Sequence, residues 1–206
     1  IDDEIGVRKT HDYNCGDNEG VQYFQSLILK GRRQSSEKAF LRPAEGRPNL
    51  TVVTGAMADR VVTDGRRATG LVFRRGGETV TATARREVIL CSGAYGTPAL
   101  MERSGIGQAA RIRDLGLEVV HDLPGVGENL QDHWHIRITH KVHNTKTLNS
   151  RVSSFFGRAM LAAEYALRRT GPMSAQPPLL AAFARVMEDA PAPDVQIHAS
   201  AASYDR

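Results

Sequence analysis

The sequence predicts a mixed fold of the α/β plus α+β class, in which helices alternate with strands and with a meander of short strands. Three observations predict it. Short β-branched runs follow one another over residues 60–84, separated by Asp-Gly and Gly-Gly turns. An apolar run at 87–90 has the character of a buried parallel strand. Segments with helical spacing follow it, and glycine or proline ends each of them.

Composition limits the partners of this chain. Its 206 residues, 41% of them apolar, are enough to bury a hydrophobic core. Lys and Arg outnumber Asp and Glu by 27 to 23, but they occur in scattered pairs without a run of five or more. This pattern argues against nucleic acid as a partner and gives no support to a membrane surface. No apolar run is long enough for a transmembrane segment.

The cysteines and the chain ends carry two further expectations. Cys15 and Cys91 lie far apart in sequence, so we expect free thiols in a reducing compartment and a cytoplasmic protein. Membrane association of a longer protein stays open, as does the oligomeric state. The chain opens without Met and stops directly after a strand-like segment, so we expect a fragment.

The first half of the chain alternates strand signals with turn signals. Residues 20–30 predict a strand closed by Gly31, and Ser35 or Ser36 can begin a short helix that stops at Pro43. Further strands are expected at 49–54, 61–63, 70–73 and 79–84, the last three forming the meander.

The second half predicts helices after an apolar strand. The strand at 87–90 ends in small residues, and Thr97 with Pro98 can then begin a helix that Gly105 ends. Further elements are expected in this order: a helix at 109–115 ended by Gly116, strands at 117–121 and 133–142, a helix at 154–169 broken by Gly171 and Pro172, and a strand at 194–198.

Two glycine-containing stretches compete as the place where a phosphate-bearing cofactor would bind. Residues 105–110 read Gly-Ile-Gly-Gln-Ala-Ala, but they follow a predicted helix. A phosphate-binding glycine turn needs a strand before it and a helix after it, so this interpretation fails. At 88–94 a strand does end in small residues, which allow a cofactor to approach the backbone closely.

In FAD proteins of the two-dinucleotide-binding type, a strand, a three-stranded meander and a second apolar strand follow one another in the same order. They lead the later part of the cofactor domain back to the flavin. Residues 93–107, Gly-Ala-Tyr-Gly-Thr-Pro-Ala-Leu-Met-Glu-Arg-Ser-Gly-Ile-Gly, resemble the second signature of the glucose-methanol-choline (GMC) oxidoreductase family at all its defined positions. Segments at 31–43, 47–51 and 122–133 agree in order and spacing. Together they most resemble the choline dehydrogenase branch of that family.

The resemblance implies a fold, a cofactor and a reaction. It implies that residues 33–134 are part of an FAD-binding domain, and that residues 1–32 and 135–206 are segments of a substrate domain with an antiparallel sheet. Members of the family oxidise small alcohols by passing hydride to flavin N5 while a histidine takes the hydroxyl proton. Both the pyrophosphate glycine motif and that histidine are expected outside this chain, so the chain alone is expected to be inactive.

The resemblance also places four cofactor-binding residues. Ala58 matches the position whose backbone meets the adenine, and Ser92, Gly93 and Ala94 match the strand end that passes near the ribose and diphosphate. Cys91 and Tyr95 depart from the small and aliphatic residues usual in the family, and Cys91 affects the packing beside the cofactor.

Several alternatives remain open from the sequence. In the loop before residue 134, Asn129, Asp132 and His133 either shape the flavin-side wall or only satisfy the amides of a turn. The histidines at 133, 135, 140 and 143 suggest a metal, but Arg137 shares the face of the first two, so we predict no metal site. Choline is the leading substrate by resemblance only, and a non-catalytic binding module is the rival function.

Overall fold

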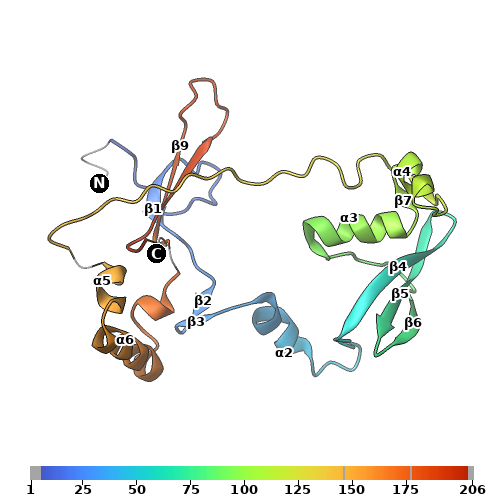
Figure 1. Cartoon of the computed structure of the whole chain (residues 1–206), viewed down its shortest axis with the longest axis horizontal. Coiled ribbons are helices and arrows are strands. Elements are labelled where there is room, and N and C mark those ends of the chain that lie inside the picture. Colours follow the sequence, from blue (N-terminus) through green and yellow to red (C-terminus); the bar gives the residue numbers. More distant parts are fainter. Residues whose placement is uncertain (1–5, 146, 177, 204–206) are drawn as a thin grey trace. The chain divides into compact units, whose positions relative to one another are not determined.

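The computed structural model describes residues 6–145, 147–176 and 178–203. These divide into two compact units, one containing the chain up to residue 47 and from residue 137 on, the other residues 48–136 (Figure 1). The outermost residues of the two predicted substrate segments, 1–5 and 204–206, lie outside the described residues. Whether either unit is a cofactor or substrate domain stays a prediction at this point.

The first unit combines an antiparallel sheet with short helices. Its elements are β1 (Gly20–Tyr23), β2 (Ile28–Leu29), β3 (Arg32–Arg33), the π-helical turn η1 (Glu37–Leu41), α2 (Arg42–Ala44), α5 (Leu148–Val152), α6 (Phe155–Arg168), the 3-10 turn η2 (Pro172–Ser174), β9 (Leu180–Ala184) and β10 (Val195–Ala199).

The strand predicted at 20–30 is two strands in the structure, β1 and β2. Pro43 lies inside α2, which continues η1 without a break and ends at Ala44, one residue beyond the predicted stop.

The three-stranded sheet of this unit has the order β1-β9-β10, with both pairs antiparallel. Ala181, in the central strand, is fully buried. On the sheet the rings of Phe24 and His198 lie 4.8 Å apart, and Tyr13 lies 5.7 Å from Phe183. The strand that the sequence predicted at 194–198 is confirmed by β10, which carries His198 of this aromatic pair.

The hairpin between β9 and β10 is closed by one carboxylate. Asp194 accepts hydrogen bonds from the backbone N–H of Val186 at 2.7 Å and of Met187 at 3.0 Å. These bonds, that of Val186 first, hold the pKa of the Asp194 carboxyl below its ordinary value. Arg185 pairs with Glu19, which ties the hairpin to the start of β1.

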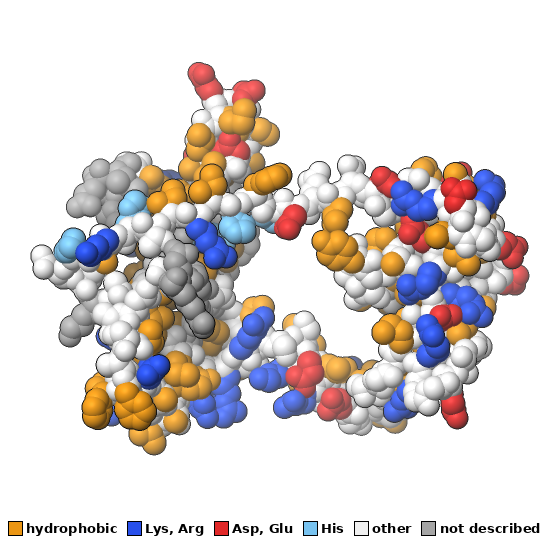
Figure 2. All heavy atoms as spheres, viewed as in Figure 1, with side chains coloured by type: hydrophobic (Ala, Val, Ile, Leu, Met, Phe, Trp, Pro, Cys, Tyr) orange, Lys and Arg blue, Asp and Glu red, His pale blue; other side chains and the backbone are white. Residues whose placement is uncertain are grey.

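Helix α6 begins and ends where the sequence predicts. The side chain of Ser154 caps it by accepting the N–H of Gly157 at 3.0 Å. Arg169 takes the left-handed conformation at its end, and Gly171 follows with a φ of +79°. Leu161 is buried, while the outer face is apolar and exposed; in Figure 2 hydrophobic side chains gather over this helix.

The second unit contains the meander and two helices packed beside it. Its elements are β4 (Ala56–Asp64), β5 (Arg67–Arg75), β6 (Glu78–Thr83), α3 (Gly93–Arg103), β7 (Ile106–Gly107), α4 (Ala109–Asp114) and β8 (His121–Asp122). The order β4-β5-β6, with tight turns at Gly65 and at Gly76 and Gly77, confirms the predicted meander. The buried side chains of this core are Val61, Val72, Leu100, Ile112 and Val126.

Several predicted strands are absent from the described part of the chain. Residues 49–54, 87–90 and 133–142 form no strand, so these three predictions are wrong. Of the strand predicted at 117–121 only the last residue is confirmed, as the start of β8. Ile89 is 73% exposed and Trp134 is fully exposed. The physical reason is that a strand exists only through the neighbour to which it hydrogen-bonds, and no described strand pairs with these segments. An apolar or alternating pattern alone does not supply that neighbour.

Candidate functional site

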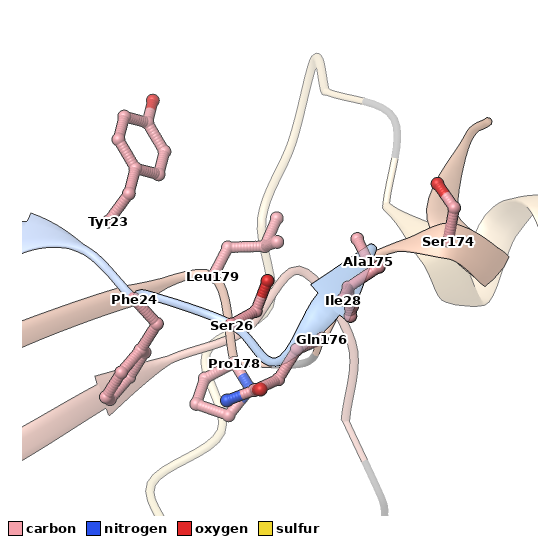
Figure 3. A pocket seen from close by; sticks show the side chains of 9 residues that line it. All are labelled: Tyr23, Phe24, Ser26, Ile28, Ser174, Ala175, Gln176, Pro178 and Leu179. Atoms are coloured by element: carbon pink, nitrogen blue, oxygen red, sulfur yellow. The ribbon is translucent and has the colours of Figure 1, made fainter. Parts of the chain in front are cut away.

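The first unit contains a shallow hollow of about 260 Å³. In Figure 3 Tyr23 lies at one end of it and Ser174 at the other. Its described lining offers hydroxyl groups and the amide of Gln176, but no carboxylate, histidine, lysine or cysteine. None of the four predicted cofactor residues lines it, and it holds no acid–base pair.

The four predicted cofactor residues lie in the second unit, on two elements that the fold brings together. Ala58 is on β4, half-buried, and Ser92, Gly93 and Ala94 stand exposed at the start of α3. Helix α3 contacts β4 at its C-terminal end (Figure 1). Two segments 34 positions apart in sequence therefore belong to one packed pair of elements.

The start of α3 leaves open space beside its backbone. Gly93 has a φ of +80°, and a Cβ built on it would meet no atom of the chain within 4 Å. The first N–H groups of an α-helix have no partner within the helix, so the amides that follow Gly93 are available to an acceptor. The positive end of the helix dipole adds attraction for negative charge. This end of α3 can bind an anionic group.

Thr97 stabilises this end of the helix in a way the sequence did not predict. The helix begins at Gly93, four residues before the predicted start at Thr97. The hydroxyl of Thr97 instead accepts the backbone N–H of Ser92 at 3.0 Å, and Pro98 lies inside the helix. This hydrogen bond fixes the turn that leads into α3.

The other end of α3 is fastened to β4 by two consecutive side chains. The buried Ser104 hydroxyl accepts the N–H of Val61 at 2.8 Å and donates to the carbonyl of Leu100 at 2.6 Å. Arg103 donates from Nε to the carbonyl of Asp59 at 3.1 Å and from Nη2 to that of Ala58 at 3.3 Å. We call these contacts of Arg103 and Ser104 the α3 clasp.

Sequence reasoning missed the α3 clasp. Ser104 was visible only as one position of the Ser-Gly-Ile-Gly stretch that ends the motif at 93–107. Nothing in the local sequence marks Arg103, because its two acceptors lie 44 and 45 positions away.

The glycines at 105 and 107 allow close packing of the chain. This agrees with the prediction that residues 105–110 are not a phosphate-binding turn. They follow helix α3, and Gly105 has a φ of +79°. Its carbonyl accepts the N–H groups of Val120 at 2.8 Å and His121 at 3.0 Å. A Cβ at Gly105 would collide with the carbonyl of Glu118 and approach the Val120 side chain to 2.9 Å. Only glycine allows the two backbone segments to come this close.

An ion-pair network holds the loop at 123–128 against the two helices. Arg111 of α4 pairs with Glu102 of α3 at 3.0 Å and with Glu128 of the loop at 2.8 Å. Gln108 donates to the same Glu128 oxygen at 2.8 Å. The hydrogen bonds to Glu102 and Glu128 raise the pKa of Arg111 above its ordinary value.

The loop residues singled out from the sequence make local contacts. Asn129 has a left-handed φ of +58°, and the carboxylate of Asp132 accepts the N–H of His133 at 2.8 Å. The Asp132 contact is the kind that a turn supplies for its own amides. In the described residues no three His, Cys, Asp or Glu side chains are grouped so as to hold a metal.

Residues 3–135 match the family model described as GMC oxidoreductase. The chain is 38% identical over 196 residues to an oxygen-dependent choline dehydrogenase of Burkholderia ambifaria and 39% identical to one of Burkholderia cenocepacia. Each alignment covers 95% of this chain but 34% of the relative, so the chain spans about a third of their length.

Solved structures agree in fold. An FAD-dependent oxidoreductase from Chaetomium thermophilum matches with a TM-score of 0.77 at 24% identity, covering 88% of this chain and 32% of its own. A fungal aryl-alcohol oxidase matches with a TM-score of 0.75 at 26% identity and the same coverage. The mixed fold class predicted from the sequence, with helices and antiparallel sheets, is confirmed. Within the described residues no helix has the length and apolar character to cross a membrane.

The buried bond of Ser104 gives a stability prediction. Ser104→Ala leaves the N–H of Val61 unpaired in the core, which is expected to lower the free energy of unfolding by about 1–3 kcal/mol. Urea denaturation measures the loss. Ser92→Ala is the matched control, because Ser92 is exposed and its side chain makes no capping bond. A loss no larger than that of the control would contradict the role given to Ser104.

Proposed function

Because this chain belongs to the GMC oxidoreductase family, we propose that the protein carrying it is an FAD-dependent oxidoreductase that oxidises the CH–OH group of a small alcohol. The curated relatives named oxygen-dependent choline dehydrogenase make choline the leading substrate class. The observation that carries the proposal is helix α3, whose sequence resembles part of the second family signature; its first turn contains predicted cofactor residues, and its last turn contacts Ala58.

The domain assignment is part of the same proposal. Residues 33–134 form part of the FAD-binding domain, and residues 1–32 and 135–206 belong to the substrate domain. In support, all four proposed cofactor residues lie in the second compact unit, and the antiparallel sheet of β1, β9 and β10 lies in the first.

The residues at α3 and β4 fit a dinucleotide on physical grounds. Gly93 has no atom of the chain where a side chain would stand, and Ser92 and Ala94 beside it are small. The exposed helix amides and the positive dipole end suit a diphosphate. Ala58 lies at a bulge in β4, where the backbone departs from regular pairing. We assign Ala58 to the adenine and residues 92–94 to the ribose and diphosphate.

In this proposal the residues of this chain bind and orient, and they do not transfer the proton. FAD, when bound, supplies the hydride acceptor for an alcohol. Ser92, Gly93 and Ala94 hold its diphosphate end by backbone approach, and Ala58 holds its adenine end. We place the histidine base and the pyrophosphate glycine motif outside these 206 residues, so the chain by itself is not expected to turn over an alcohol.

The visible spectrum of the full-length protein tests the function. We expect a flavin band at about 450 nm that is bleached when choline or a primary alcohol is added without oxygen. A panel of alcohols then ranks the substrates. A colourless protein that stays inert after FAD is added would contradict the proposal and favour a non-catalytic binding module.

Gly93→Val tests the cofactor site. A β-branched side chain would fill the open space beside the helix amides and strain a backbone with a φ of +80°. We expect the full-length variant to bind FAD about tenfold more weakly or worse, measured by titrating the deflavinated protein.

The control for Gly93→Val is Gly116→Val, at the end of α4. Gly116 has a φ of +72°, and a Cβ there also meets nothing within 4 Å. It therefore imposes the same kind of backbone strain away from the proposed site, and flavin binding is expected to survive. Equal loss in both variants would mean that strain alone is responsible, and would contradict the assignment.

A further inference from the structure

Strand β4 is irregular at the residue proposed to meet the adenine. Ala58 pairs with Phe73 of β5, and Arg60 pairs with the adjacent residue Val72. Asp59, between Ala58 and Arg60, therefore has no residue opposite it. Such a bulge releases backbone groups from the ladder and bends the strand. At this bulge, partners from another element can hold the carbonyls of Ala58 and Asp59 in place.

Arg103 supplies those partners. Its Nε donates to the carbonyl of Asp59 at 3.1 Å, and its Nη2 donates to that of Ala58 at 3.3 Å. A guanidinium is a planar fork of donors, so it can hold two consecutive carbonyls at a fixed spacing. The charge on the donor also strengthens each bond relative to a neutral one.

The carboxylate of Asp59 does not compete for this guanidinium. It pairs with Arg60 at 2.8 Å and with Arg74 at 3.5 Å. Among the described residues Arg103 has no carboxylate partner within ion-pair distance, and its hydrogen bonds go to backbone alone. Its hydrogen bonds therefore hold the backbone conformation of β4 and do not neutralise a carboxylate.

The core of the unit does not depend on Arg103. The buried contact of the α3 clasp is made by Ser104, whereas the Arg103 side chain is exposed. Arg103 also stands in the last turn of the helix whose first turn carries Gly93 and Ala94. One rigid element thus links the two groups of residues assigned to the cofactor.

We infer that Arg103 is a positioning residue for the adenosine half of FAD, holding the bulged backbone of Ala58 in the conformation that receives the adenine. This inference rests on the proposed function, because it takes FAD as the ligand and Ala58 as its adenine contact. It adds that a surface arginine, acting only through backbone carbonyls, determines how well that contact is formed.

The test separates the adenosine half of the ligand from the flavin half. ADP carries adenosine and diphosphate without flavin, so it reports on the proposed contact directly. In the full-length deflavinated protein, Arg103→Met is expected to weaken FAD binding about tenfold and to weaken ADP, as a competitor of FAD, by the same factor. The unfolding temperature of the apoprotein, measured alongside, is expected to match that of the control.

The matched control is Arg113→Met. Arg113 also stands near the end of a helix of the same unit, and its side chain makes no hydrogen bond or ion pair with the described residues. It is expected to leave both affinities unchanged. Arg103→Lys keeps the charge without the planar fork and serves as a second variant; its smaller loss is expected to be again equal for FAD and ADP.

Three results would each have a clear meaning. Weaker FAD binding with unchanged ADP binding would overturn the inference, as would affinities equal to those of the control. Wild-type protein that binds FAD but not ADP would also overturn it while leaving the proposed function standing. Wild-type protein that binds neither would show that the proposed function itself has failed.

Discussion

The α3 clasp is the contact on which the arrangement of the second unit depends. The meander can form from local turns, but it does not by itself determine where the following helix lies. Ser104 determines this by accepting the buried N–H of Val61, and Arg103 adds exposed hydrogen bonds to the neighbouring carbonyls of β4. A buried N–H without an acceptor is costly, so the helix is held at one place along β4. The open start of α3 is thereby placed relative to the bulge.

The other glycines and ion pairs of this unit support the same arrangement. Gly105 lets the chain leave α3 directly against the strand at His121, since any side chain would collide with the neighbouring backbone. The pairs of Arg111 with Glu102 and Glu128 then join α3, α4 and the following loop. These pairs are partly exposed, so they help to position the loop more than they stabilise the fold.

Features encoded by neighbouring residues could be predicted from the sequence. The turns at Gly65 and Gly76, the bounds of helix α6 and the end of a helix at Gly105 each need only a few adjacent positions, and each was predicted. The segments at 87–90 and 133–142 failed as strands because a strand needs a distant neighbour. Arg103 could not be identified for a similar reason, since its role exists only once the helix lies beside the bulge.

We have assigned the adenine of FAD to Ala58, at the end of β4 that the α3 clasp holds. Photolabelling of the full-length protein with an FAD analogue that carries an azide on its adenine tests this claim most directly. We expect the label on the tryptic peptide that ends at Arg60, and we expect excess ADP to prevent the labelling. Labelling confined to peptides that lack β4 and α3 would contradict the account.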